Sequence, residues 1–127
     1  MAKWAHADVL DNGINHIKNN ATKMMVISAY TAGDSYATVT GNKCAEVTMT
    51  GTDYTVSSSG NNRQVQSAAG KSATATANSG ATPNLHIAFT DGSAKVLWVT
   101  DETSDQVITS GNTVNFPQLT YTSNQPT

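Results

Sequence analysis

The chain has 127 residues, which is most simply one domain (1–127) with a hydrophobic core of its own. Only 13% of its residues are charged, against about 25% in typical soluble domains, and the net charge is −2. The few basic residues are scattered, so no basic stripe predicts direct binding of nucleic acid.

The missing charge is replaced by threonine, serine, asparagine and alanine. Charge keeps copies of a soluble protein apart, so a surface this neutral favours a subunit that is covered by neighbours in an assembly. The alternative is an extracellular β-domain with a polar, uncharged surface.

Cysteine usage and the N-terminal sequence argue against a secreted or membrane protein. Cys44 is the single cysteine, which excludes an intramolecular disulfide and argues against a cysteine-based metal site. Asp8 and Asp11 stand where a signal peptide would be apolar, and no segment is long enough to span a bilayer. We therefore expect a chain that is made and folded in a cytosol, with no membrane partner.

Residues 4–20 are predicted to form a short amphipathic helix within an N-terminal helical segment, 1–22. Apolar side chains recur there at helical spacing: Leu10, Ile14, Ile17 and Ala21. Asp8 can cap its N-terminus, while Gly13 weakens its interior. The apolar side of this helix is expected to lie on the sheet or on a partner subunit.

A β domain is predicted over residues 23–122. The apolar run 23–30 predicts a buried strand, and 36–40 begins with the alternation of another. Residues 42–47 fit one helical turn slightly better than a continuing strand. Residues 52–56 read as a strand, and 57–62 as a loop.

An unusual alternation of small residues follows. Three alanines alternate with hydroxyl side chains over residues 72–77, which predicts a strand with a thin face of methyl groups: Ala73, Ala75 and Ala77. Such a face allows another backbone to approach closely. It suits either the edge of a β-sandwich or a contact between subunits.

The densest apolar stretch, 85–100, predicts a β-hairpin around Asp91-Gly92. A two-residue turn would pair Leu85 with Trp98, Ile87 with Val96 and Phe89 with Ala94, all on one face. A four-residue loop keeps this grouping, whereas a three-residue loop scrambles it. The opposite face, with His86, is half polar. The predicted core residues are Leu85, Ile87, Phe89, Val96 and Trp98.

Short strands are expected at 106–110 and 113–116, and a polar tail at 123–127. Recurrent short strands with turn signals between them predict a mainly β fold. We expect an antiparallel sandwich or barrel-like domain, with the N-terminal helix and one further candidate helical turn, 42–47, attached.

No motif predicts catalysis, and we assign no catalytic, cofactor-binding or metal-binding residue. The acidic turn of Asp101, Glu102 and Asp105 lacks the alternating ligands and glycine of an EF-hand. The run 69–72 echoes the end of a P-loop without its first glycine. The three histidines have no metal-binding spacing, so the sequence does not indicate an enzyme.

Several segments together carry a resemblance. These are AHADVLDNGINHIKNNA, KMMVISAYTAGDSYATV, LHIAFTDG, VLWVTDE and NTVNFPQLTYTSNQPT. Over nearly the whole chain they resemble small structural proteins encoded in the virion modules of tailed bacteriophages. The resemblance implies a virion protein made in the host cytoplasm, most often a capsid decoration (cement) protein on the major capsid protein. Small tail-tube and fibre subunits are the close competitors.

A cement protein is expected to be a homo-oligomer, with a trimer as our guess, and to need no cofactor. The chain ends and the alanine strand are the candidate contacts with partners: Trp4, Ile14, Ile17, Ala73, Ala75, Ala77 and Gln125. Trp4 is the best single anchor, although it could equally pack against its own helix. A different class of function, a host-surface or carbohydrate-binding module, would use Trp98 and the tyrosines as stacking faces.

Overall fold

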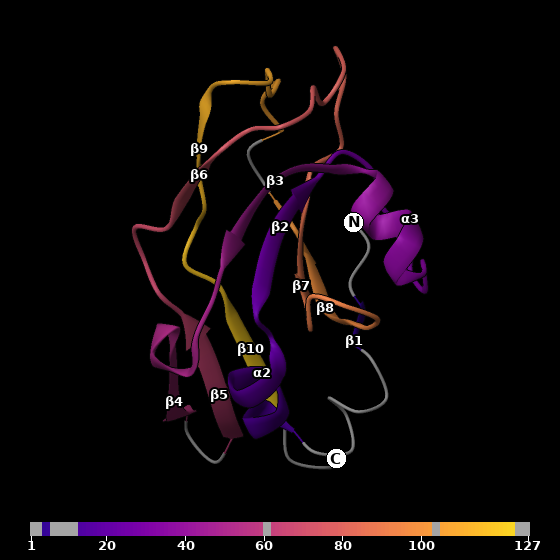
Figure 1. The fold of residues 1–127 in the computed structure, drawn as a ribbon. Coiled ribbons are helices and arrows are strands. Elements are labelled where there is room, and N and C mark those ends of the chain that lie inside the picture. Colours follow the sequence, from indigo (N-terminus) through magenta and orange to yellow (C-terminus); the bar gives the residue numbers. More distant parts are fainter. Residues whose placement is uncertain (1–3, 6–12, 60–61, 103–104, 124–127) are drawn as a thin grey trace.

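A computed structural model describes residues 4–5, 13–59, 62–102 and 105–123. The protein is mainly β, with antiparallel sheets and a few short helical elements, as the sequence predicted (Figure 1). The layers resemble a sandwich, because a three-stranded sheet packs across one face of a five-stranded sheet.

The larger sheet has its neighbouring strands antiparallel throughout. In spatial order the strands are β1 (Trp4–Ala5), β8 (Val96–Asp101), β7 (His86–Thr90), β2 (Lys23–Ile27) and β3 (Lys43–Thr48). Its central strands are buried on both faces, which explains why they are continuous apolar runs and not alternating ones.

Two smaller sheets complete the β structure. The three-stranded sheet has the order β10 (Thr120–Ser123), β5 (Asn62–Ser67) and β4 (Tyr54–Ser59). The two-stranded ribbon pairs β6 (Ser72–Thr74) with β9 (Thr113–Asn115). The ribbon continues beside β3, where the main-chain N–H of Thr76 donates to Cys44 O at 2.7 Å.

The N-terminal helix is shorter than predicted. Helix α2 spans Ile14–Asn20 and follows Gly13, whose φ of 65° lies in the left-handed region that glycine tolerates. The expectation of a helix from residue 4 is wrong at its start, because Trp4–Ala5 forms strand β1 against β8. The predicted cap, Asp8, lies outside the described residues.

Helix and strand are exchanged in the 36–48 region. Tyr36–Gly41 forms helix α3, and Lys43–Thr48 forms strand β3, the reverse of the favoured expectation. Ser35 starts the helix, because its Oγ accepts a hydrogen bond from Thr38 N at 3.2 Å. The alternation of apolar and polar residues at Tyr36–Thr40 predicted a strand, but the cap at Ser35 makes this segment helical. The next segment is a strand because it pairs with β2.

Three further expectations change. The predicted strand over 52–56 begins instead with a 3₁₀ helix, η1 (Gly51–Asp53), and the predicted loop 57–62 is mostly a hairpin of β4 and β5. Residues 106–110 form no strand, because Ile108 bonds through its main chain to Ser79 on a neighbouring loop.

The main core lies between the two larger sheets and is crossed by a row of aromatic rings. Phe89 stacks on Trp98 with centroids 4.8 Å apart, Tyr54 lies 6.3 Å from Phe89, and Tyr121 meets Trp98 edge-on at 5.5 Å. Phe89 and Trp98 come from the larger sheet, while Tyr54 and Tyr121 come from the smaller one. This aromatic row therefore joins the two layers.

The hairpin register differs from the one predicted. Phe89 pairs with Trp98, and a shift between Phe89 and Thr90 then pairs Thr90 with Val96. The five predicted core residues are all buried, but the shift moves Val96 to the opposite face of the sheet. Ala94, which was expected opposite Phe89, is exposed in a turn that is longer than two residues.

Candidate interaction surface

The aromatic side chains proposed for stacking on a ligand are used inside the protein. Trp98 is only 7% exposed, and Tyr30 and Tyr54 are buried. Tyr36 and Tyr121 are half-buried against the core. Burial also raises the pKa of Tyr54, whose hydroxyl donates to Ala21 O at 2.7 Å. None of these five rings is exposed: three are buried and two are half-buried.

Most of the side chains predicted to contact partners are also internal. Ile14 and Ile17 are buried on α2 against the smaller sheet, and Ala75 is buried in the main core. Ala73 and Ala77 are half-buried, so the thin alanine face packs inward on its own domain. The remaining two predictions, the side chain of Trp4 and residue Gln125, lie outside what the structure describes.

His86 is the one buried side chain with an unsatisfied nitrogen among the described residues. It is 1% exposed, and its ring lies 5.7 Å from that of Tyr30. Nδ1 lies 3.0 Å from Asn84 O, a pure acceptor, so Nδ1 carries the proton and donates. Nε2 has no hydrogen-bond partner and lies 3.8 Å from Asp101 Oδ1.

The acidic turn is tied to the larger sheet. Asp105 Oδ1 accepts from Leu85 N at 2.8 Å, and Glu102 N donates to Leu85 O. Within the described ranges, no three His, Cys, Asp or Glu side chains form a group that could hold a metal ion. Cys44 is buried, which raises the pKa of its thiol and leaves it mostly protonated.

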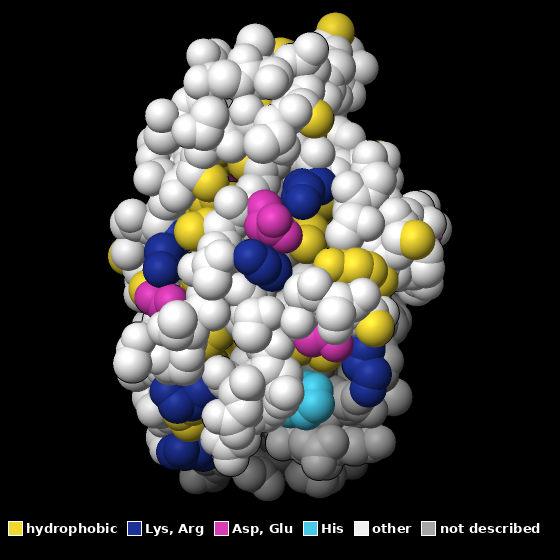
Figure 2. Space-filling view, viewed as in Figure 1, with side chains coloured by type: hydrophobic (Ala, Val, Ile, Leu, Met, Phe, Trp, Pro, Cys, Tyr) yellow, Lys and Arg dark blue, Asp and Glu magenta, His cyan; other side chains and the backbone are white. Residues whose placement is uncertain are grey.

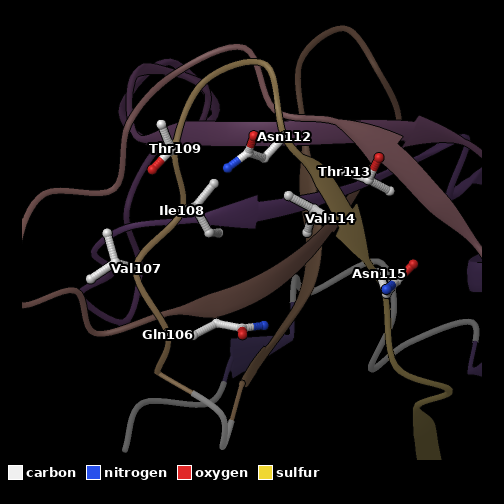
Figure 3. Close-up of a pocket in the computed structure, with 8 residues that line it drawn as sticks. All are labelled: Gln106, Val107, Ile108, Thr109, Asn112, Thr113, Val114 and Asn115. Atoms are coloured by element: carbon white, nitrogen blue, oxygen red, sulfur yellow. The ribbon is translucent and has the colours of Figure 1, made fainter.

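A shallow pocket that the sequence did not indicate lies between the 106–112 loop and β9. Figure 3 shows Ile108 and Val114 pointing toward each other across it, while Val107 points away. Its volume is about 220 Å³, and Val107 at its rim is 58% exposed. The lining is neutral, with carboxamides, hydroxyls and aliphatic groups: Gln106, Val107, Ile108, Thr109, Asn112, Thr113, Val114 and Asn115.

The prediction of a strand at 106–110 hid this pocket. The sequence signal that could have revealed it is Val107, an apolar residue among polar ones that no alternation places in a core. The polar groups that line the pocket can donate hydrogen bonds to a neutral partner and accept them from it, but none of these groups ionises near neutral pH. The pocket therefore provides contact chemistry and no acid, base or charged nucleophile.

The face of the molecule shown in Figure 2 carries little charge, in line with the 13% of charged residues in the sequence. In the view of Figure 2, uncharged polar side chains and backbone predominate, and the charged groups stand apart in small numbers. Some are already paired, as in the contact of Lys71 Nζ with Asp53 Oδ1 at 3.0 Å. Together with a hydrogen bond from Thr50 N, which contributes most, this contact lowers the pKa of Asp53.

The outer strands of the smaller sheets contain no charged residue of their own. Strands β4, β6, β9 and β10 contain no Lys, Arg, Asp or Glu. Proteins that remain monomeric commonly protect an exposed strand edge with a charged side chain, a proline or a bulge. Among the described residues, Lys18 reaches only the start of β4 and β3 lies beside β6, so β10 and the rest of β4 have no charged side chain, proline or register shift of their own.

The described residues include no helix that is long and apolar enough to cross a lipid bilayer. No protein-family model, no curated protein and no solved structure matches this chain.

Proposed function

We propose that this chain is a structural virion protein of a tailed bacteriophage that decorates and stabilises the capsid by binding the major capsid protein. The observation that carries the proposal is the set of uncharged strand edges, which suits a subunit surrounded by neighbours. The resemblance to small virion proteins supplies the kind of assembly.

Such a protein acts by contact. Each copy needs only a modest affinity for the shell, because neighbouring copies that also bind one another gain from a high effective concentration. Main-chain hydrogen bonds at a strand edge provide such contacts without charged side chains. We therefore propose a homo-oligomer located on the virion, and we assign it no catalytic step.

A tail-tube or fibre subunit is the second candidate, and the same edges favour it. In the part of the chain that the structure describes, the three-stranded sheet ends at β4 on one side and at β10 on the other, with no further strand paired to either. Edges of this kind can also build rings or filaments, which would use both of them. A carbohydrate-binding module is less favoured, since the five rings considered for stacking are buried or half-buried.

Cryo-electron microscopy of the assembled virion tests the proposal directly. We expect density for this chain in repeated positions on the outer capsid surface, in contact with the major capsid protein. Density in the tail or fibres would establish the second candidate instead. Absence from the particle would contradict both.

A binding experiment with purified shells gives an independent test. Shells that lack the protein should bind it to saturation at a fixed number of copies per shell. They should then resist heating to a higher temperature than bare shells. A shell whose surface is already decorated is the matched control and should take up no more protein.

A further inference from the structure

The direction of each main-chain group on β4 follows from a single hydrogen bond. Tyr54 lies opposite Ser67 in the β4–β5 pair, but Ser67 N donates to Leu119 O at 2.8 Å, away from β4. Tyr54 and Ser67 are therefore a non-hydrogen-bonded pair. Because such pairs alternate with hydrogen-bonded ones, the N–H and C=O groups of Val56 and Ser58 also point away from β5.

At Tyr54, the first residue of β4, the outward main-chain groups already have partners within the protein. Tyr54 N caps η1 by donating to Gly51 O, and Tyr54 O accepts from Lys18 Nζ at 2.9 Å. No comparable hydrogen bond reaches the main chain of Val56 or Ser58 from any described residue. Thr55 and Ser58 are exposed, so the edge is open just beyond Tyr54.

We propose that this open edge pairs antiparallel with β4 of a second copy, about a two-fold axis through Ser57. In that register Val56 lies opposite Ser58 of the other copy, and each exchanges its N–H and C=O with the other. The two three-stranded sheets then become one continuous sheet. The contact is self-complementary, as a two-fold interface requires.

The choice of a second copy and of this register rests on the edge itself. The strand YTVSSS contains no charged residue and no proline, so an identical strand brings no like charges of its own to the seam. The nearest cations, Lys18 and Arg63, already bond to Tyr54 O and Ser58 Oγ. A register centred on Val56 would place Ser58 against Tyr54, whose main-chain groups are already bonded to Gly51 and Lys18. Centring on Ser57 uses both open residues and leaves those bonds intact.

This inference deepens the proposed assembly role by naming one partner, and it can fail separately. If the chain stays monomeric in solution and still binds capsid shells, the pairing of β4 is wrong and the assembly role stands. If it forms the β4 pair but is absent from the virion, the pairing stands and the proposed function is wrong.

A cysteine at Ser57 tests the axis, because only the residue on the axis lies opposite its own copy. The two Cβ atoms of such a pair are about 4.5–5.5 Å apart, close enough for a disulfide with small adjustments. We expect Ser57→Cys to form a disulfide-linked dimer under mild oxidation, read on a non-reducing gel. Thr55→Cys, expected opposite Ser59, is the matched control and should remain largely unlinked.

A lysine at Ser57 tests the same seam by repulsion. In Ser57→Lys the two ammonium groups would lie across the axis, and we expect the dimer dissociation constant to rise roughly tenfold or more by sedimentation, with partial recovery in high salt. Thr120→Lys, on the opposite edge strand β10, is the control and should leave the dimer dissociation constant unchanged. Circular dichroism and thermal unfolding should show both variants folded.

Three outcomes would overturn the pairing. One is an unmodified chain that is monomeric or trimeric at all concentrations. Another is dissociation by Thr120→Lys in place of Ser57→Lys, which would move the contact to β10. The third is equal cross-linking of the Ser57→Cys and Thr55→Cys variants.

Discussion

The two faces of the five-stranded sheet are both buried, but they are covered in different ways. One face is covered by a second sheet through the aromatic row of Tyr54, Phe89, Trp98 and Tyr121. The other face has no second sheet in the described part of the chain. There a thin outer cover, made by the six-residue helix α3 with Val39 and by Tyr30 and Tyr36, shields a few side chains: Met25, Ile27, Ala88, Val96 and Val99.

This difference explains why the central strands are largely apolar although, among the described residues, only one of their faces meets a second sheet. A strand with one wet face alternates, whereas a strand covered on both faces is apolar throughout. Most of the half-polar face predicted for the hairpin is in fact buried, including Thr90 and His86, whereas Lys95 is exposed and Leu97 joins the main core. The thin cover needs only small and medium side chains opposite it, so it leaves little trace in the sequence.

The largest effect should come from the aromatic row. Trp98→Ala removes the ring that stacks on Phe89 and contacts Tyr121, and we expect the free energy of unfolding to fall by about 3–5 kcal/mol. Chemical denaturation measures this loss. Trp98→Phe, which keeps a stacked ring, is the control and should lose less. A loss below about 1 kcal/mol for Trp98→Ala would show that the row does not join the sheets.

A matched pair of valines compares the two faces at equal chemistry. Val26→Ala removes two methyl groups from the main core, and we expect a loss of about 2 kcal/mol. Val39→Ala removes the same groups from the outer cover, but alanine favours the helix by roughly 0.6 kcal/mol, so its loss should be nearer 1 kcal/mol.

Denaturation of the two valine variants under identical conditions checks the difference. Equal losses would mean that the outer cover is packed as tightly as the main core. A loss near zero for Val39→Ala would mean that α3 does not hold its face closed.

The class of fold and the central strands could be predicted from the sequence, because apolar runs such as 23–27 and 85–89 report burial directly. The exchange of helix and strand over 36–48 could not, because it depends on one cap at Ser35 and on distant pairing with β2. The open edge at β4 could not either. Which main-chain groups of β4 point outward, and which of them are free, depends on contacts of Ser67 and Lys18 with residues far along the chain.

The smallest effect concerns the turn that decides to which face Val96 belongs. Asp91 Oδ1 accepts hydrogen bonds from the main-chain N–H groups of Ser93, Ala94 and Lys95 at 2.9, 2.8 and 3.0 Å. Burial alone would raise the pKa of Asp91, but these hydrogen bonds outweigh it and hold the pKa below its usual value of 3.8. The charged carboxylate therefore stabilises the turn, and with it the shifted register.

The sign of the pH dependence follows from the lowered pKa. A carboxyl whose pKa is lower in the folded state stabilises the fold above its unfolded pKa, about 3.9, and this contribution is lost as the pH falls through the folded pKa. Asp91→Asn should therefore cost roughly 1 kcal/mol at pH 7 and progressively less toward pH 2, measured by denaturation at each pH. Because Asp53, whose pKa is also lowered, titrates in both proteins, the difference between them isolates Asp91. A pH-independent difference would mean that the asparagine side chain destabilises the turn for steric reasons, and that the charge of Asp91 does not hold Val96 on its face of the sheet.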